Sequence, residues 1–341
     1  MAAIHGRQAD GPDAGARMNA EHYCRQIMQQ AGSTFALAFR GMTRDQQRAM
    51  RAVYAFARII DDVVDAESPV REKAAALSEW RARLATIGGT HVAPPTGKAR
   101  WVPPSRARCA LWDFLVHPLR GYPDSVVATL DNGRPVESGH PVMAELAWGA
   151  RTFGCHPRYA RALLEGCARD ITTATYRDWP ALRDYCYSVA GTVGLLCLPI
   201  FGVREEDRTR QAAINLGHAF QLTNILRDLR EDAARGRCYL PQDDLAHFGI
   251  AAAQFSAGGS PGIDRERFRS LMFYEIARAQ SCYRSAWERF TVDEQRLMRA
   301  ARVMSRAYHR VLQKIAADPV GVLHGRVGLT WWEKVRVLCA S

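Results

Sequence analysis

Apolar residues recur at every third or fourth position through most of the chain, and no stretch longer than a few residues alternates apolar with polar. This spacing is typical of amphipathic helices and not of strands. The pattern therefore predicts an all-α protein. Helices are predicted over residues 20–31, 43–65, 70–87, 141–153, 157–176, 180–198, 205–232, 264–289 and 292–316.

Two regions do not follow the helical pattern. Residues 91–135 are rich in proline, and residues 242–262 are rich in alanine, glycine and serine, so both are predicted to be loops or irregular insertions. Residues 1–16 are predicted to be a flexible tail. No linker-like break divides residues 17–341, which predicts one large domain in which 91–138 is an insertion without an assigned role.

Composition narrows the class of protein. The 341 residues are 48% hydrophobic, too apolar for a disordered chain, and the net charge of +11 comes from arginines spread along nearly every segment. Nine cysteines without a C-x-x-C pair argue against a disulfide framework or a zinc ribbon and favour a reducing compartment. The N-terminal residues lack the apolar core of a signal peptide, so the sequence predicts a cytoplasmic protein.

The longest uncharged run, residues 185–203, reaches the length of a membrane span. It contains Gly191, Gly194 and Pro199, and small residues of this kind allow helices to pack closely. We expect a buried helix with a small-residue face rather than a span.

Polar side chains form a stripe along the otherwise apolar helix predicted over residues 43–65. Tyr54, Arg58, Asp61 and Asp65 return to nearly the same azimuth, because an α-helix has about 3.6 residues per turn. The helix thus ends in a D-x-x-x-D pair on one face.

A second helix repeats the arrangement. Gln221, Asn224, Asp228 and Asp232 form another polar stripe within an apolar helix, and this stripe also ends in D-x-x-x-D. A single such pair is usually a solvated helix face. Two copies inside apolar helices predict facing walls of one site.

Facing carboxylate clusters require a cation. Two carboxylates about 5 Å apart repel by roughly 3 kcal/mol at an effective dielectric constant near 20, so they must be protonated, solvated or bridged. Dense oxygen ligands suit Mg²⁺, which is typically held by a few carboxylates together with substrate phosphates. The pattern therefore indicates a magnesium site that binds a diphosphate.

The chain resembles the squalene/phytoene synthases, the head-to-head isoprenyl diphosphate synthases. Four segments match the motifs of that family in order and spacing: 54–65, 185–194, 221–232 and 235–241. The resemblance covers roughly residues 20–90 and 138–338. Within the family, residues 267–302 and 325–329 are most similar to bacterial presqualene diphosphate synthases of hopanoid pathways.

The resemblance implies a single all-α domain of the isoprenoid synthase type with a central cavity, and Mg²⁺-dependent prenyltransferase activity, with Mn²⁺ as a substitute ion. Metal binding is implied for Asp61, Asp62, Asp65, Asp228 and Asp232, assisted by Asp170, Gln221 and Asn224. Arg58, Arg227 and Arg237 would contact diphosphate oxygens, and Tyr54 and Tyr185 would line the reaction centre.

Other positions are expected to contact the substrate. The family commonly carries a serine ahead of the first substrate-binding helix, where this chain offers Ser33 or Thr34. Carbocation chemistry needs a dry wall for the prenyl chain, and the uncharged helix supplies one. We expect Gly191 and Gly194 to leave room for that chain, beside Val189 and Val193.

The expected reaction joins two C15 farnesyl diphosphates into presqualene diphosphate, and continuation to squalene would require NADPH. One alternative is a phytoene synthase of carotenoid biosynthesis, which condenses two C20 geranylgeranyl diphosphates. Another is a non-catalytic assembly or scaffold protein on the same fold, although the retained aspartates argue against it. No helix concentrates arginine with stacking aromatics, so nucleic acid is not an expected partner.

Isoprenoid products partition into bilayers. The sequence therefore predicts a cytoplasmic protein with peripheral contact to the inner face of the membrane, helped by the positive charge. Downstream enzymes of isoprenoid biosynthesis are the other expected partners.

Overall fold

The computed structural model describes residues 12–30, 38–89, 140–255 and 262–339, and these residues form helices and connecting turns. The α-helices are α1 Pro12–Gln30, α3 Arg44–Asp65, α4 Val70–Ala85, α6 Pro141–Phe153, α7 Pro157–Ala168, α8 Trp179–Cys186, α9 Thr192–Phe201, α10 Asp207–Ala234, α11 Gln242–His247, α12 Arg265–Arg289, α13 Val292–Leu297, α14 Arg299–Ala317 and α15 Trp331–Cys339. Short 3₁₀ turns are η1 Phe39–Gly41, η2 Thr86–Gly89, η3 Arg169–Ile171, η5 Ala252–Phe255 and η6 Gly321–Leu323, and η4 Tyr187–Gly191 is a π-helical turn. The all-α prediction is confirmed, since the described residues pair as strands only at the isolated bridge between Thr175 and Cys238.

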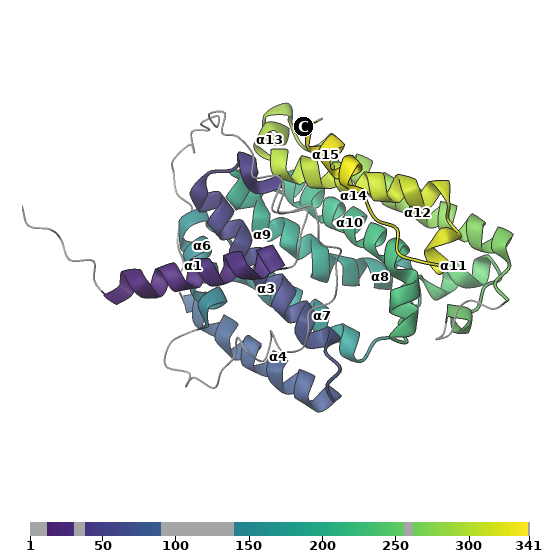
Figure 1. The fold of residues 1–341 in the computed structure, drawn as a ribbon, viewed down its shortest axis with the longest axis horizontal. Helices are drawn as coiled ribbons and strands as arrows, with labels where there is room; N and C mark the ends of the chain where they lie inside the picture. The colour runs from purple at the N-terminus through teal and green to yellow at the C-terminus, as the bar shows by residue number, and fades with distance from the viewer. Residues whose placement is uncertain (1–11, 31–37, 90–139, 256–261, 340–341) are drawn as a thin grey trace, which may run out of the picture.

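Helix α10 is the longest element of the bundle and contacts α8, η4, α9, α12 and α14 (Figure 1). Helix α3 packs against α1, α4, α6, α7 and α9. The core is continuous between these groups, with Phe56 and Ile60 of α3 and Leu226 of α10 fully buried. The two stripe-bearing helices therefore belong to one packed unit.

Several helix limits differ from the predicted ones. Helix α7 ends at Ala168, where the chain tightens into η3, so the helix predicted to run to residue 176 stops early. The helix predicted over 292–316 is two helices, because Met298 turns the chain and is itself buried. Helices α11 and α15 were not predicted, and α1 begins at Pro12, within the segment expected as a tail. Nearly all of the expected insertion, 91–138, lies outside the described residues.

The uncharged run folds as α8, η4 and α9 in succession. In the described part of the chain, Trp179–Phe201 is one stretch long and apolar enough to cross a membrane, and 61% of its apolar window is buried. The run packs against α3, α7 and α10. The expected packing of a small-residue face is thus present in the fold.

The space beside the glycines of this run is filled by α10. A Cβ at Gly194 would lie 2.9 Å from the carbonyl oxygen of Ala213, and one at Gly191 would lie 3.7 Å from Cα of Ile214. Gly217 of α10 is closer still, since its Cβ would approach the backbone nitrogen of Gly191 to 2.5 Å. The missing side chains of Gly191 and Gly194 therefore allow α10 to pack closely, and their expected place beside a prenyl chain stays a prediction.

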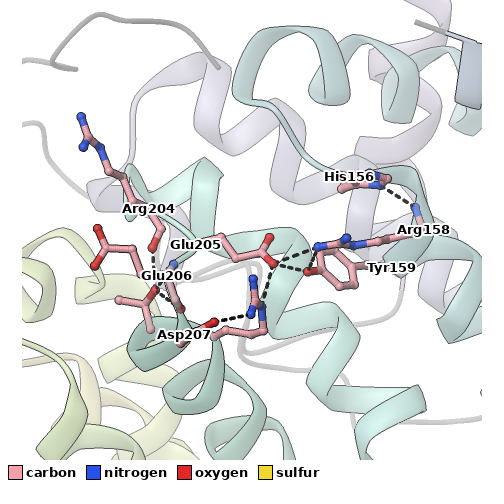
Figure 2. A network of polar contacts seen from close by, with 9 residues as sticks. His156, Arg158, Tyr159, Arg204, Glu205, Glu206 and Asp207 are labelled. Atoms are coloured by element: carbon pink, nitrogen blue, oxygen red, sulfur yellow. Dashed lines mark hydrogen bonds and ion pairs between the residues drawn. The ribbon is translucent and has the colours of Figure 1, made fainter. Parts of the chain in front are cut away.

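A polar network ties the beginning of α10 to the beginning of α7 (Figure 2). The carboxylate of Glu205 accepts hydrogen bonds from the Tyr159 hydroxyl, from Arg158 Nη2 at 3.1 Å and from Arg210 Nε at 3.0 Å. Burial alone would raise the pKa of Glu205, but the donors from Tyr159 and Arg210 hold it below the ordinary value. The charged carboxylate therefore stabilises the junction of the two helices.

Replacing Glu205 with Gln should lower the free energy of unfolding by about 1 kcal/mol, because the amide accepts fewer and weaker hydrogen bonds in this partly exposed network. Urea denaturation measures the effect, with Asp207→Asn as the control, since Asp207 is exposed and pairs with Arg210 at the surface. A lowered folded-state pKa gives stability above the unfolded pKa, so the difference should shrink below about pH 4. Equal losses in both variants would contradict this account.

Candidate active site

Helix α3 carries its polar stripe on an apolar support. Thr43 and Gln46 form a capping box that fixes the start of the helix, while Phe56, Ile60 and Val64 are buried in the core. The opposite face holds the acidic residues, and α3 ends at Asp65. Carboxylates near a helix C-terminus meet the negative end of the helix dipole, so they need cationic partners.

The acids of α3 have such partners. Arg58 Nη2 lies 2.6 Å from Asp62 Oδ1, and Asp61 Oδ1 accepts a hydrogen bond from the Cys167 thiol at 3.4 Å. The side chain of Asp61 is exposed on one side. The protein packed around its other sides removes part of its hydration, and this raises its pKa to about 7. An acid that both repels its neighbours and opens to solvent is suited to receive a cation.

Helix α10 presents the second stripe. Asp228 is paired with Arg227, whose Nε lies 2.7 Å away, and with Arg326 Nε at 2.9 Å. Burial raises the pKa of Asp232 to about 7, and the charges of Asp228 and Asp65 add to the shift. Both acidic ends are linked through Arg237, which follows α10 and pairs with Asp65 of α3.

Arginines that directly follow α10 join the two stripes. Arg237 Nη1 lies 2.9 Å from Asp65 Oδ1, and Arg235 Nη1 lies 3.3 Å from Asp65 Oδ2. The backbone nitrogen of Arg237 donates to the carbonyl oxygen of Asp232 at 2.9 Å. The structure thus brings Asp65, which ends the first matched segment, next to Asp232 and Arg237 of the last two matched segments.

A tyrosine cluster adjoins this junction. The ring of Tyr185 lies 5.1 Å from that of Tyr176 and 5.3 Å from that of Tyr239, measured between centroids. The Tyr185 hydroxyl donates to Asp170 Oδ2 at 2.7 Å, and burial raises the pKa of Asp170 to about 6 despite this bond. Aromatic faces stabilise positive charge, so the cluster can accommodate a cation.

The remaining expected positions are placed as follows. Tyr54 and Gln221 are half-buried on α3 and α10, Val189 lies in η4, and Val193 lies in α9. Ser33 and Thr34 lie outside the described residues. Sequence reasoning missed the contacts of Arg235, Arg326, Tyr239 and Cys167. Arg235 and Tyr239 lie in the matched segment 235–241, and Arg326 lies in the similar segment 325–329. Membership of these segments is the sequence signal that could have indicated them.

The donor set fits a divalent ion, although three of its carboxylates, Asp62, Asp65 and Asp228, are paired with arginine. Among the described residues, no three acidic, histidine or cysteine side chains converge on one point where an ion would sit. Three buried side-chain oxygens in the described part of the chain have no hydrogen-bond partner, however: the Tyr176 hydroxyl of the tyrosine cluster, Asp170 Oδ1 and Asn224 Oδ1, of which the last two are carboxyl and amide oxygens. Buried oxygens without a partner are costly, and together with the nearby carboxylates they form an all-oxygen set typical of Mg²⁺ sites.

The neighbouring acids and arginines of the site can bind a metal ion and a phosphate group together. Each arginine offers several donors in a rigid fork that matches phosphate oxygens, and each carboxylate offers oxygens to a metal ion. A metal-bound diphosphate would satisfy both sets at once, since the arginines would exchange carboxylate for phosphate. The site is thus built to bind a small, highly charged anion beside an aromatic cluster.

Comparison with known proteins places this arrangement in a family. The sequence profile of squalene/phytoene synthase matches residues 28–333. A phytoene synthase from Arthrospira platensis is 29% identical over 334 residues, which cover 94% of this chain and 92% of the relative. The chain belongs to the squalene/phytoene synthase family, and it is a prenyltransferase of the kind that joins isoprenyl diphosphates head to head.

Solved structures agree on the fold. A dehydrosqualene synthase in complex with a ligand superposes with a TM-score of 0.69 at 23% identity, covering 96% of each chain. The squalene synthase HpnC from Alicyclobacillus acidocaldarius superposes with a TM-score of 0.66 at 22% identity, covering 89% of this chain and 97% of the other. The predicted isoprenoid synthase architecture is therefore confirmed, and the family generally depends on a divalent metal.

Proposed function

We propose that the protein condenses two farnesyl diphosphates into presqualene diphosphate in a Mg²⁺-dependent reaction. The observation that carries the proposal is the junction of Asp65, Arg237 and Asp232, where two acidic helices and a cluster of arginines meet beside three tyrosines. A diphosphate needs cations on its oxygens, and an allylic cation needs aromatic faces and little water. The junction offers both.

In the proposed reaction, the C–O bond of one farnesyl diphosphate breaks and its electron pair leaves with the diphosphate. Arg58, Arg227 and Arg237 bind the departing oxygens and lower the barrier by neutralising their growing charge. The double bond of the second substrate attacks the allylic cation, and loss of a proton closes the cyclopropane. Tyr185 and its neighbouring rings face the positive charge while it lasts.

The residues proposed to hold Mg²⁺ are the acids of both stripes, together with the carboxyl and amide oxygens of Asp170 and Asn224 that have no hydrogen-bond partner among the described residues. Bound there, the metal would act as a Lewis acid on the diphosphate. The set comprises Asp61, Asp62, Asp65, Asp170, Asn224, Asp228 and Asp232.

The choice of a C15 substrate rests on the wall formed by η4 and α9. A longer C20 chain needs a deeper pocket, and small residues along this wall would provide it. Gly191 and Gly194 are filled by α10 instead, which leaves the larger Val189 and Val193 as the partly exposed side chains. The similarity of residues 325–329 to presqualene diphosphate synthases points the same way.

Phytoene synthesis is the second candidate function. The relative from Arthrospira platensis is a phytoene synthase, and so is one from Mycobacterium tuberculosis that is 30% identical to this chain. The substrate for that function would be geranylgeranyl diphosphate. We further propose a cytoplasmic location with peripheral contact to the membrane, and NADPH as a requirement only for a second step to squalene.

Purified protein incubated with Mg²⁺ and either the C15 or the C20 diphosphate tests the proposal. We expect presqualene diphosphate from the C15 substrate, and no product after addition of EDTA. Exclusive turnover of the C20 substrate would replace this function by phytoene synthesis. No turnover of either substrate would favour the scaffold alternative.

A further inference from the structure

A groove of about 760 Å³ lies between α12, α14 and α15, and none of the aspartates described above lines it. Helix α14 contacts both α12 and α15, and the three helices lie together on one side of the bundle (Figure 1). Tyr283 and Trp287 of α12 contribute aromatic side chains to the groove, and the Tyr283 hydroxyl is bonded to Thr223 of α10 at 3.1 Å. The volume is typical of a ligand site.

Positive charge dominates the walls of the groove. The arginines that line it come from all three helices: Arg284 of α12, Arg302, Arg306 and Arg310 of α14, and Arg336 of α15. The three on α14 are spaced by four residues, so they form one stripe in which like charges repel. Glu333 is the acidic residue among the lining side chains.

That single acid does not neutralise the groove. Glu333 is already bonded to Lys314 Nζ at 3.0 Å and to the backbone nitrogen of Thr330 at 2.8 Å, besides Arg310 at 3.3 Å. Arg284 and Arg336 are exposed and have no ion-pair partner among the residues that the structure describes. The described residues thus leave the groove with an excess of positive charge, which is complementary to an anion.

The edge of the groove carries an exposed tryptophan. Trp332 has 73% of its surface exposed, and it precedes Arg336 by one helical turn on the same side of α15. Indole rings favour the boundary between water and the lipid headgroups, where one end is apolar and the other wet. A small inorganic phosphate has no apolar surface for such a ring to contact, whereas a bilayer surface does.

We propose that this groove binds the phosphate headgroup of an anionic phospholipid and docks the protein on the membrane surface through Trp332 and the surrounding arginines. The inference rests on the membrane contact proposed above and assigns it to α12, α14 and α15. Arginine forks bind the phosphate, and the indole enters the headgroup layer. Because the groove is separate from the aspartates, docking does not occupy the catalytic residues.

Co-sedimentation of the full chain with vesicles tests the proposal, using phosphatidylcholine alone or with about one third phosphatidylglycerol. The wild type should bind the anionic vesicles, and added salt should weaken this binding. The double variant Arg284→Gln, Arg336→Gln should bind about tenfold more weakly, because each basic residue near an anionic surface strengthens attachment several-fold. Trp332→Ala should also weaken binding.

The matched control is Arg151→Gln, Arg265→Gln, which removes two exposed arginines from α6 and from the start of α12. It should bind like the wild type. Equal losses in both double variants would show that only net charge matters and would overturn the proposal. A wild type that does not bind anionic vesicles would also overturn it.

Prenyl condensation in detergent, measured in parallel, separates this proposal from the proposed function. Full activity of the Arg284→Gln, Arg336→Gln variant in detergent is expected, because neither arginine lies at the aspartates. Vesicle binding without any condensation would overturn the enzymatic function and support the docking surface. Condensation without vesicle binding would support the enzymatic function and overturn the docking surface.

Discussion

The Asp61→Asn variant is expected to lose about 10³-fold in kcat/KM, the scale typical for removal of one preorganised group that stabilises charge in a transition state. Asp61 is exposed near the end of α3, and its side-chain hydrogen bond within the described part of the chain is to the Cys167 thiol, so its oxygens are available to a metal ion. Asparagine keeps the shape and can still accept from Cys167. The loss therefore reports on the charge.

Steady-state kinetics with the diphosphate substrate measures this effect. Asp207→Asn makes the same chemical change at the exposed start of α10 and should leave kcat/KM unchanged. If Asp61→Asn retained more than about a tenth of wild-type activity, the proposed role of this carboxylate in metal binding would be wrong.

Replacing Gly217 with Ala should lower the free energy of unfolding by about 3 kcal/mol, the upper range for overpacking in a core. Its new Cβ would meet backbone atoms of Ala190 and Gly191 at 2.7 Å and 2.5 Å, and backbone cannot move aside like a side chain. Because α10 also carries Asn224 and Asp228, the shift should reduce activity in the protein that still folds.

Gly149→Ala on α6 is the matched control, since its Cβ would lie 3.7 Å from that of Ala49, an ordinary contact. Alanine is favoured over glycine inside a helix by about 0.5–1 kcal/mol, so this variant should be at least as stable as the wild type. Thermal or urea denaturation compares the two. Similar stabilities for both variants would contradict the close approach of α10 to η4.

The sequence pattern was sufficient for the helical architecture because amphipathic spacing and capping are local. The capping box of Thr43 and Gln46, for example, is present where it was predicted. Helix α15 escaped prediction because it is short and its pattern is set by packing on α14. The end of α7 was missed because no proline or glycine stands where the helix passes into the η3 turn, Arg169–Ile171.

The candidate site shows the same division. Helical periodicity alone groups Asp61 with Asp65 and Asp228 with Asp232. It cannot reveal that Arg326, about a hundred residues from Asp228, pairs with it, or that Arg237 reaches Asp65, since such contacts depend on the folded chain. Nor could spacing show that Gly191 and Gly194 face α10, because a missing side chain serves a ligand or a neighbouring helix equally well.

Anomalous diffraction from crystals grown with Mn²⁺ and an unreactive thiodiphosphate analogue of farnesyl diphosphate tests the central claim most directly. The account predicts Mn²⁺ peaks between Asp61 and Asp65 of α3 and Asp228 and Asp232 of α10, with Arg58, Arg227 and Arg237 moved from carboxylate to phosphate oxygens. Mn²⁺ and analogue bound elsewhere, with Asp62, Asp65 and Asp228 still paired with arginine, would contradict it.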